Sequence, residues 1–342
     1  MINLDKNENQ YGPSEKCKKV IQNITLEMFN SYSRSYPKLI INKLEKEFKI
    51  NGEHILLGYG SEDILKQIFY FVSKDKKRKK VLLASQAWWY YSAIAREVNA
   101  EIFYYDMVEK KKSFEYDITR ILEILDKETI DILIICSPNN PTGNSLKKND
   151  LKKILKKSKK KKTVVVFDEA YWGFAYTSNY ALKLVEDYDN LIVLRTFSKF
   201  YALAGLRIGF GFAGKSLKSL IQFNMRYLGY NRISEELSFA ALDSKDYYLK
   251  VAKLMENDKK KYYKELEKLG LKVYRSDANF ILVKVPNEWL DILKVELEKA
   301  GVIVRFFNDG VLKNTIRISI GTQEQNEVVI KLFQEILGEK YN

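Results

Sequence analysis

Six short apolar segments, spaced by stretches of helical character, constrain the fold of this chain more than any other feature. Several are continuous apolar runs bounded by polar or turn residues, the pattern of strands buried on both faces of a parallel sheet. Helical stretches such as 61–73 and 146–157 lie between them. This order predicts an α/β fold in which helices cover a mostly parallel sheet. The strand candidates are 81–84, 101–105, 132–136, 163–168, 191–196 and 209–213.

The pattern changes beyond about residue 245, where a long helix rich in lysine and glutamate precedes further strand and helix candidates. This α+β texture predicts a second, smaller domain. We expect an N-terminal arm and small-domain segment at 1–30, a large domain at 31–240 and a small C-terminal domain at 241–342. The candidates here are helices 248–269, 288–300 and 323–336, and strands 272–274, 279–285, 302–306 and 315–320.

The net charge of +14 raises the question of a nucleic-acid or acidic membrane partner. The excess lies in lysine runs at 76–80, 110–112 and 156–162, between or at the ends of apolar segments. Such runs are usually solvated helix ends and loops. We therefore expect no nucleic-acid partner, and an influence of the surplus charge on phosphorylated substrates is the better supported interpretation.

The chain has no apolar run near the roughly 20 residues that a membrane span needs, and its first residues lack a secretory pattern. We expect a cytoplasmic protein without membrane contact. Two cysteines, Cys17 and Cys136, and one histidine, His54, do not make a metal cluster, so no metal is expected. The cysteines are interpreted as reduced core residues and His54 as structural, which leaves lysine, tyrosine or carboxylate groups to move protons.

Unusual polar segments follow three of the predicted strands, at the sheet edge where open α/β proteins place ligand groups. They are 137–143 (SPNNPTG), 168–171 (DEAY) and 195–199 (RTFSK), and Arg207 follows shortly after the last. A lysine there can form an imine with an aldehyde if its pKa is lowered. A carboxylate can keep a pyridine nitrogen protonated, and a helix N-terminus at 60–62 with a hydroxyl and a guanidinium can hold a phosphate. Together these groups suit a phosphorylated pyridine aldehyde.

With these segments in place, the chain resembles the fold-type I pyridoxal-phosphate aminotransferases, and most of all the histidinol-phosphate aminotransferase family, over nearly its full length. The resemblance implies a large domain with a mostly parallel sheet covered by helices, and a smaller α+β C-terminal domain. It is highly specific for the cofactor and the fold, and less so for the substrate. It is carried by SPNNPTG and DEAY and by 7–13 (NENQYGP), 36–37 (YP), 58–63 (GYGSED), 197–210 (FSKFYALAGLRIGF) and 316–322 (IRISIGT).

The resemblance also implies roles for single residues around the cofactor, pyridoxal 5'-phosphate. Lys199 is implied as the Schiff-base lysine, Asp168 as the partner of the pyridine nitrogen, and Asn140 and Tyr171 as partners of the phenolate oxygen. The implied contacts of the cofactor phosphate are Gly60, Ser61, Glu62, Thr196, Ser198 and Arg207, with Ser61 and Glu62 acting largely through their backbone N–H groups.

For the substrate, the resemblance implies that Arg317 binds the carboxylate and that Arg305 and Tyr11 contact the distal or phosphate end. Tyr36 corresponds to a residue that reaches the phosphate in the neighbouring subunit, which implies a homodimer with shared active sites. Trp88 stands where the family has a ring that stacks on the cofactor, and indole offers a larger face for that contact. The segments 86–89 (QAWW) and 226–232 (RYLGYNR) depart from the family pattern and crowd the substrate pocket.

These implications predict an enzyme that moves an amino group between an amino acid, glutamate being the expected donor, and a small phosphorylated keto compound. Imidazole-acetol phosphate and the smaller dihydroxyacetone phosphate are the candidate acceptors. A pyridoxal-phosphate-dependent decarboxylase of phosphoserine or phosphothreonine is the enzymatic alternative. A catalytically silent regulator or nucleic-acid-binding protein on the same scaffold is a third hypothesis, which the intact Lys199, Asp168 and Arg207 disfavour.

Overall fold

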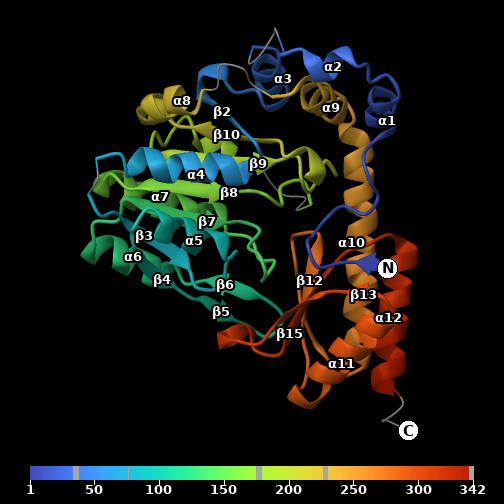
Figure 1. The fold of residues 1–342 in the computed structure, drawn as a ribbon. Helices are drawn as coiled ribbons and strands as arrows, with labels where there is room; N and C mark the ends of the chain where they lie inside the picture. Colours follow the sequence, from blue (N-terminus) through green and yellow to red (C-terminus); the bar gives the residue numbers. More distant parts are fainter. Residues whose placement is uncertain (34–37, 76, 175–178, 226–229, 339–342) are drawn as a thin grey trace.

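A seven-stranded sheet forms the centre of the larger lobe (Figure 1). The computed structural model describes residues 1–33, 38–75, 77–174, 179–225 and 230–338. The strand order is β2-β10-β9-β8-β7-β3-β4, and only β10 runs antiparallel to its neighbours. All six expected strands are present. The strands are β2 (Ile55–Gly58), β3 (Lys80–Ala84), β4 (Glu101–Tyr105), β7 (Ile132–Cys136), β8 (Val164–Asp168), β9 (Leu191–Thr196) and β10 (Gly209–Ala213).

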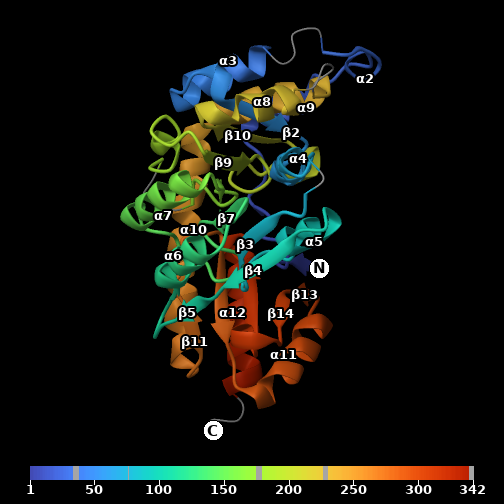
Figure 2. The same cartoon turned by 90° about the vertical axis from the view of Figure 1, so that its left-hand side faces the viewer.

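Helices cover both faces of this sheet, and Figure 2 shows α4 and α5 on one side and α6 and α7 on the other. This arrangement explains why the sequence of β7 is apolar throughout. Ile132 and Ile134 pack with α4 and α5, while Leu133 and Ile135 pack with α6 and α7. Successive side chains of a strand point to opposite faces, so a strand covered on both sides needs apolar residues at every position. The helices are α3 (Lys38–Phe48), α4 (Ser61–Val72), α5 (Tyr90–Glu97), α6 (Ile118–Lys127), α7 (Lys148–Lys161) and α8 (Lys218–Asn224).

The smaller lobe is an antiparallel four-stranded sheet in the order β11-β12-β15-β14, packed with α10, α11 and α12. The expected strand at 302–306 is two strands, because its first half pairs with the N-terminal β1 and its second half with β15. The chain start is thereby joined to the C-terminal part of the sequence. The elements are β1 (Ile2–Asn3), α10 (Lys245–Lys268), β11 (Lys272–Tyr274), β12 (Phe280–Lys284), α11 (Asn287–Lys299), β13 (Val302–Ile303), β14 (Arg305–Phe307), β15 (Thr315–Ser319) and α12 (Gln323–Gly338).

Short elements connect the two lobes and complete the described chain. The β5–β6 hairpin reaches the smaller lobe, where the Phe114 and Tyr274 rings lie 4.7 Å apart. Helices α1, α2 and α3 pack against α9 at the far end of the larger lobe. These elements are α1 (Glu15–Gln22), α2 (Glu27–Asn30), β5 (Met107–Glu109), β6 (Phe114–Tyr116) and α9 (Arg232–Leu242), with 3-10 turns at Gly52–His54, Leu182–Leu184, Ala204–Leu206, Lys215–Leu217 and Gly310–Leu312.

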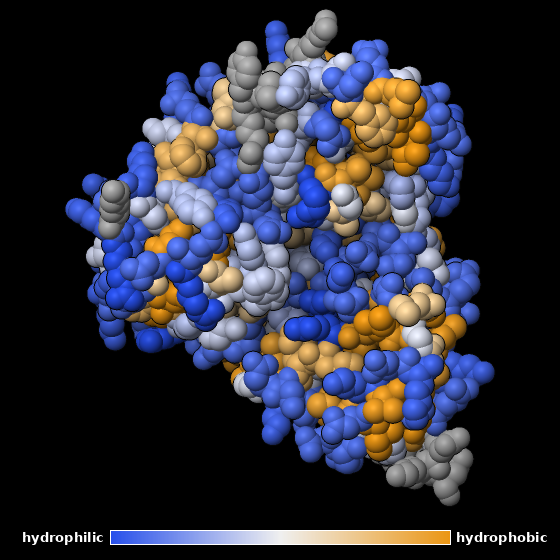
Figure 3. Space-filling model, viewed as in Figure 1, coloured by the Kyte–Doolittle hydropathy of each residue, from blue (hydrophilic) through white to orange (hydrophobic). Residues whose placement is uncertain are grey.

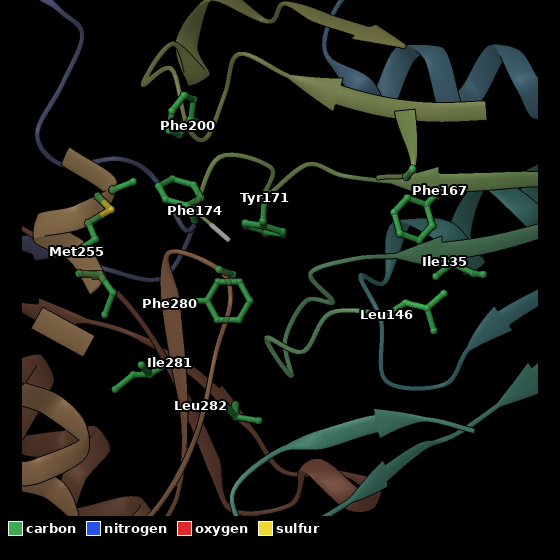
Figure 4. Packing of buried hydrophobic residues seen from close by; sticks show 14 of the residues in the cluster. Ile135, Leu146, Phe167, Tyr171, Phe174, Phe200, Met255, Phe280, Ile281 and Leu282 are labelled. Carbon is green, nitrogen blue, oxygen red and sulfur yellow. The ribbon is translucent and has the colours of Figure 1, made fainter. Parts of the chain in front are cut away.

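One apolar core spans the boundary between the lobes. Figure 4 shows Phe280, Ile281 and Leu282 of β12 beside Tyr171 and Phe174 of the larger lobe. The Tyr171 and Phe280 rings meet edge to face at 5.2 Å. The surface between the lobes is hollowed and largely hydrophilic (Figure 3). The predicted division into 1–30, 31–240 and 241–342 stays a prediction, and the pairing of β1 with β13 agrees with placing the chain start in the smaller lobe.

The cysteines and the histidine, which were interpreted from the sequence as structural residues, are buried. His54 Nδ1 lies 2.6 Å from the carbonyl oxygen of Ala213, and Cys17 and Cys136 are buried and unbridged. Within the described ranges, no helix is both long and apolar enough to cross a membrane. Those ranges also hold no group of three or more histidine, cysteine or acidic side chains with the geometry of a metal site.

Candidate active site

A cavity of about 1130 Å³ opens where the ends of β7, β8 and β9 meet the N-terminal arm and the smaller lobe. The ends of neighbouring parallel strands lie at one sheet edge, so the polar segments that follow them converge there. Twelve of the predicted site residues line this cavity. They are Ser61, Glu62, Trp88, Asn140, Asp168, Tyr171, Thr196, Ser198, Lys199, Arg207, Arg305 and Arg317.

Lys199 follows β9, and its amine is prepared for nucleophilic chemistry. The Nζ atom donates a hydrogen bond of 2.6 Å to the carbonyl oxygen of Lys6 on the N-terminal arm. Burial lowers the pKa of Lys199 to about 8, and the positive charges of Arg317 and Arg207 act in the same direction. A substantial fraction of this amine is therefore neutral near pH 8, which is the form that attacks an aldehyde.

Asp168 is the last residue of β8 and its carboxylate is buried. Its Oδ2 accepts a hydrogen bond of 2.8 Å from the Tyr91 hydroxyl, and its Oδ1 accepts one of 2.9 Å from the Ala170 N–H. Burial raises the pKa of Asp168 to about 6, and these two hydrogen bonds counteract that rise. No basic side chain of the described ranges pairs with it, so the carboxylate is suited to a cationic group of a bound molecule.

Tyr171 and Asn140 are held so that each keeps a donor group for the cavity. The Tyr171 hydroxyl accepts a hydrogen bond of 2.9 Å from Asn7 Nδ2. The Asn140 Oδ1 accepts one of 2.5 Å from Arg317 Nη1, and Arg317 Nη2 donates to the carbonyl of Asp5. The O–H of Tyr171 and the N–H₂ of Asn140 are therefore available to an anionic oxygen.

A cradle for a dianion lies at the N-terminus of α4. Gly60 caps this helix with φ +83°, a conformation that favours glycine, and a Cβ there would displace the Arg207 guanidinium, whose Nη2 would lie 2.6 Å away. Arg207 donates to Ser198 Oγ at 3.3 Å and pairs with Glu62 at 3.5 Å. The Thr196 hydroxyl lies 3.0 Å from Ser198 Oγ. Helix N–H groups, hydroxyls and a guanidinium are the groups that bind phosphate.

Trp88, Arg305 and Arg317 also line the cavity. Trp88 is half-buried beside the cavity, and its ring meets Tyr91 edge-on at 5.6 Å. Arg305 and Arg317 face each other on β14 and β15, with Arg305 exposed and Arg317 buried. Two cationic side chains on adjacent strands suit a substrate with an acidic group at each end.

The remaining two predicted residues are Tyr11 and Tyr36. Tyr11 does not line the cavity: its hydroxyl faces the smaller lobe, where burial first and then the charge of Asp258 raise its pKa to about 12. The Tyr247 hydroxyl donates to the Tyr11 carbonyl at 3.2 Å. The expected substrate contact at Tyr11 stays a prediction. Tyr36 and residues 226–229 lie outside the described residues.

Four residues that contribute to the cavity were not foreseen from the sequence. Tyr91 carries the hydrogen bond to Asp168, and its position in the first turn of the helix after strand 80–84 was the available signal. Asn7 belongs to the segment 7–13 (NENQYGP), for which the resemblance implied no role at this position. The carbonyls of Asp5 and Lys6 carry no sequence signal, because every residue has a carbonyl.

Comparison with known proteins agrees with this geometry. The profile described as aminotransferase class I and II matches residues 1–333. Histidinol-phosphate aminotransferase of Methanocaldococcus jannaschii is 30% identical over 342 residues, covering 99% of this chain and 90% of that protein. Its counterpart in Bacillus subtilis is 30% identical over 339 residues, covering 98% and 92%. The chain therefore belongs to the aminotransferase class I and II family.

A solved structure confirms the architecture. Histidinol-phosphate aminotransferase of Sinorhizobium meliloti, in complex with pyridoxal-5'-phosphate, superposes with a TM-score of 0.88 at 20% identity and covers 99% of this chain and 91% of that one. The predicted fold class, a fold-type I transferase with a mostly parallel sheet, is thus confirmed.

Proposed function

We propose that this protein is a pyridoxal-phosphate-dependent aminotransferase that moves an amino group between glutamate and a small phosphorylated keto compound. The observation that carries the proposal is the convergence on one cavity of the Lys199 amine, the buried carboxylate of Asp168 and the Arg207 cradle. Family membership and the named relatives support the coarser reaction class.

The residues of the cavity fit this cofactor. Asp168 lacks a cationic partner among the described residues, and a protonated pyridine nitrogen would supply one. The α4 N-terminus, Ser198 and Arg207 would hold the phosphate, while Tyr171 and Asn140 would donate to the ring oxygen. When bound, the cofactor supplies an aldehyde for covalent attachment and a ring that accepts electrons.

Lys199 carries the proton transfers in this proposal. Its lowered pKa makes Nζ first a nucleophile and then, once released, a base that takes the proton from the substrate Cα. The Lys6 carbonyl orients the Lys199 amine when that amine is free. Because the donor must leave before the acceptor enters the same cavity, we expect ping-pong kinetics.

The paired arginines explain how one cavity would serve two substrates. Arg317 would bind the carboxylate of the amino donor, replacing the carbonyl of Asp5 that it holds now. The exposed Arg305 beside it would bind the distal acid group, whether a carboxylate of glutamate or a phosphate of the acceptor. The names of the relatives favour imidazole-acetol phosphate as that acceptor, and dihydroxyacetone phosphate is the smaller alternative.

A homodimer with shared active sites is part of the proposal. Large apolar side chains are exposed on the described surface, among them Leu26 at 85%, Phe29 at 68% and Trp89 at 68%. Trp89 lines the cavity, so a second copy covering it would also help to close the site. Sedimentation of the purified protein should give a dimer, and the variant Trp89→Glu should weaken the dimer and the activity together. A fully active monomer would contradict this part.

The reaction is tested by incubating the cofactor-loaded protein with glutamate and each acceptor in turn. We expect formation of 2-oxoglutarate with equal amination of the acceptor, measured by mass spectrometry. Release of CO₂ from phosphoserine or phosphothreonine, without an acceptor, would overturn the proposal in favour of a decarboxylase. Salt-dependent binding to DNA with no turnover would indicate a silent scaffold protein instead.

A further inference from the structure

The N-terminal arm touches three of the cavity's polar side chains through three consecutive residues. Lys199 donates to the carbonyl of Lys6 at 2.6 Å, and Arg317 donates to the carbonyl of Asp5. The third contact differs from these two, because the side chain of Asn7 meets the side chain of Tyr171 at 2.9 Å. Any residue can supply a backbone carbonyl, whereas the third contact depends on asparagine.

Asn7 is fixed on every side. It is 1% exposed and adopts the left-handed conformation with φ +55°, which asparagine tolerates better than most residues. Its N–H donates to Ser319 Oγ at 2.9 Å, and its carbonyl accepts from Asn279 Nδ2 at 3.1 Å. Its side-chain Oδ1 lies 3.2 Å from Ser319 Oγ, whose hydroxyl donates to the carbonyl of Leu4 at 2.7 Å.

The hydrogen bond to Tyr171 runs from the Asn7 side chain, whose Nδ2 group donates to the tyrosine oxygen at 2.9 Å. An amide nitrogen only donates, so the tyrosine oxygen accepts and its own hydrogen must point elsewhere. Tyr171 is buried and lines the cavity. Its hydrogen is therefore available to an acceptor in the cavity, and a hydroxyl that accepts one hydrogen bond donates the next more strongly.

We propose that Asn7 is a positioning residue, whose amide directs the O–H hydrogen of Tyr171 into the cavity, toward the ring oxygen of the bound cofactor. The inference rests on the proposed function, since it assumes that the cofactor places its phenolate oxygen near Tyr171. Asn7 itself need not touch the cofactor. Its effect passes through Tyr171, and this distinguishes it from a residue that merely anchors the arm.

The test measures the pH at which the absorption spectrum of the bound cofactor changes. Asn7→Gly removes the amide and keeps the backbone conformation, because glycine adopts positive φ readily. Weaker donation from Tyr171 stabilises negative charge on the ring oxygen less, so the cofactor should keep its proton to higher pH, with a midpoint raised by about 0.5 to 1 pH unit. Asn7→Asp places an acceptor at the same spot, which turns the tyrosine hydrogen away, and should raise the midpoint further.

A matched control and a double variant separate positioning from structure. Gln10→Ala removes another arm amide, one that donates to the carbonyl of Asn3, and should leave the midpoint unchanged. In a Tyr171→Phe background, Asn7→Gly should add no further shift. An equal shift with and without Tyr171, or a lowered melting temperature of the cofactor-free protein without any shift, would overturn the inference. A wild-type protein that binds no cofactor would refute the proposed function instead.

Discussion

The two lobes supply the cavity in different ways. In the larger lobe, site residues sit at or just after strand ends: Asp168 closes β8, and Lys199 comes soon after β9 ends at Thr196. In the smaller lobe and the arm, Arg305 and Arg317 are brought together by strand pairing, and Asp5, Lys6 and Asn7 by the path of the chain start. The sheet edge thus fixes the groups proposed for the cofactor, while the arm and smaller lobe orient those groups and would bind the substrate.

The largest expected effect is that of removing the central amine of the larger lobe. Lys199→Ala should abolish the covalent attachment of the cofactor, so that borohydride reduction leaves no adduct on the protein. It should also lower turnover by at least about 10³-fold. Peptide mapping after reduction and a steady-state assay measure the two effects. Lys148→Ala, at the exposed start of α7, is the control and should change neither. An adduct on a different lysine would break the assignment of Lys199.

The smaller lobe should affect substrate binding instead. Arg317→Ala should raise the KM for glutamate by about 10²-fold, since a buried guanidinium bound to a carboxylate is lost. Arg305→Ala should raise the KM for glutamate by about 10-fold. The KM for alanine, which has no distal acid group, should stay unchanged. Parallel kinetics with the two donors measure the contrast. If Arg305→Ala raised the KM equally for both donors, Arg305 would not bind the distal acid group.

The buried carboxylate should make the stability of the cofactor-free protein depend on pH. Burial raises the pKa of Asp168 to about 6, so the folded chain binds this proton more tightly than the unfolded chain does. Its contribution to the free energy of unfolding should therefore fall, by on the order of 2 kcal/mol, as the pH rises from about 4 to about 7. Urea unfolding of the wild type and Asp168→Asn measures this, and a difference between them that is constant with pH would contradict it.

The smallest effect is expected at Tyr91, which the larger lobe places behind the carboxylate. Tyr91→Phe removes the hydrogen bond that favours ionised Asp168, so the cofactor should bind about 5- to 10-fold more weakly near pH 7. Fluorescence titration measures the affinity. Tyr90→Phe, on the next residue, is the control, because the Tyr90 ring packs on Trp88. If both variants bound the cofactor alike, the hydrogen bond would have no role in holding it.

Local patterns predicted the strands and much of the cavity. The apolar runs at 132–136 and 191–196 are strands because burial on both faces demands such runs, and the polar groups after them converge because parallel strands end together. The direction of the Tyr11 side chain could not be predicted in this way. A motif fixes the order of residues but not the direction of a side chain, and the Tyr11 hydroxyl lies near Asp258 of the smaller lobe.

The sequence by itself therefore predicted six strands of the central sheet from apolar periodicity and the groups at the strand ends from residue type, and the family resemblance implied the reaction class. Only the tertiary structure decided that strand 302–306 divides between β1 and β15, that Tyr91 supports Asp168, and that Asn7 meets Tyr171. These contacts join residues far apart in the chain. Their geometry follows from how the two lobes pack, and no local pattern encodes that packing.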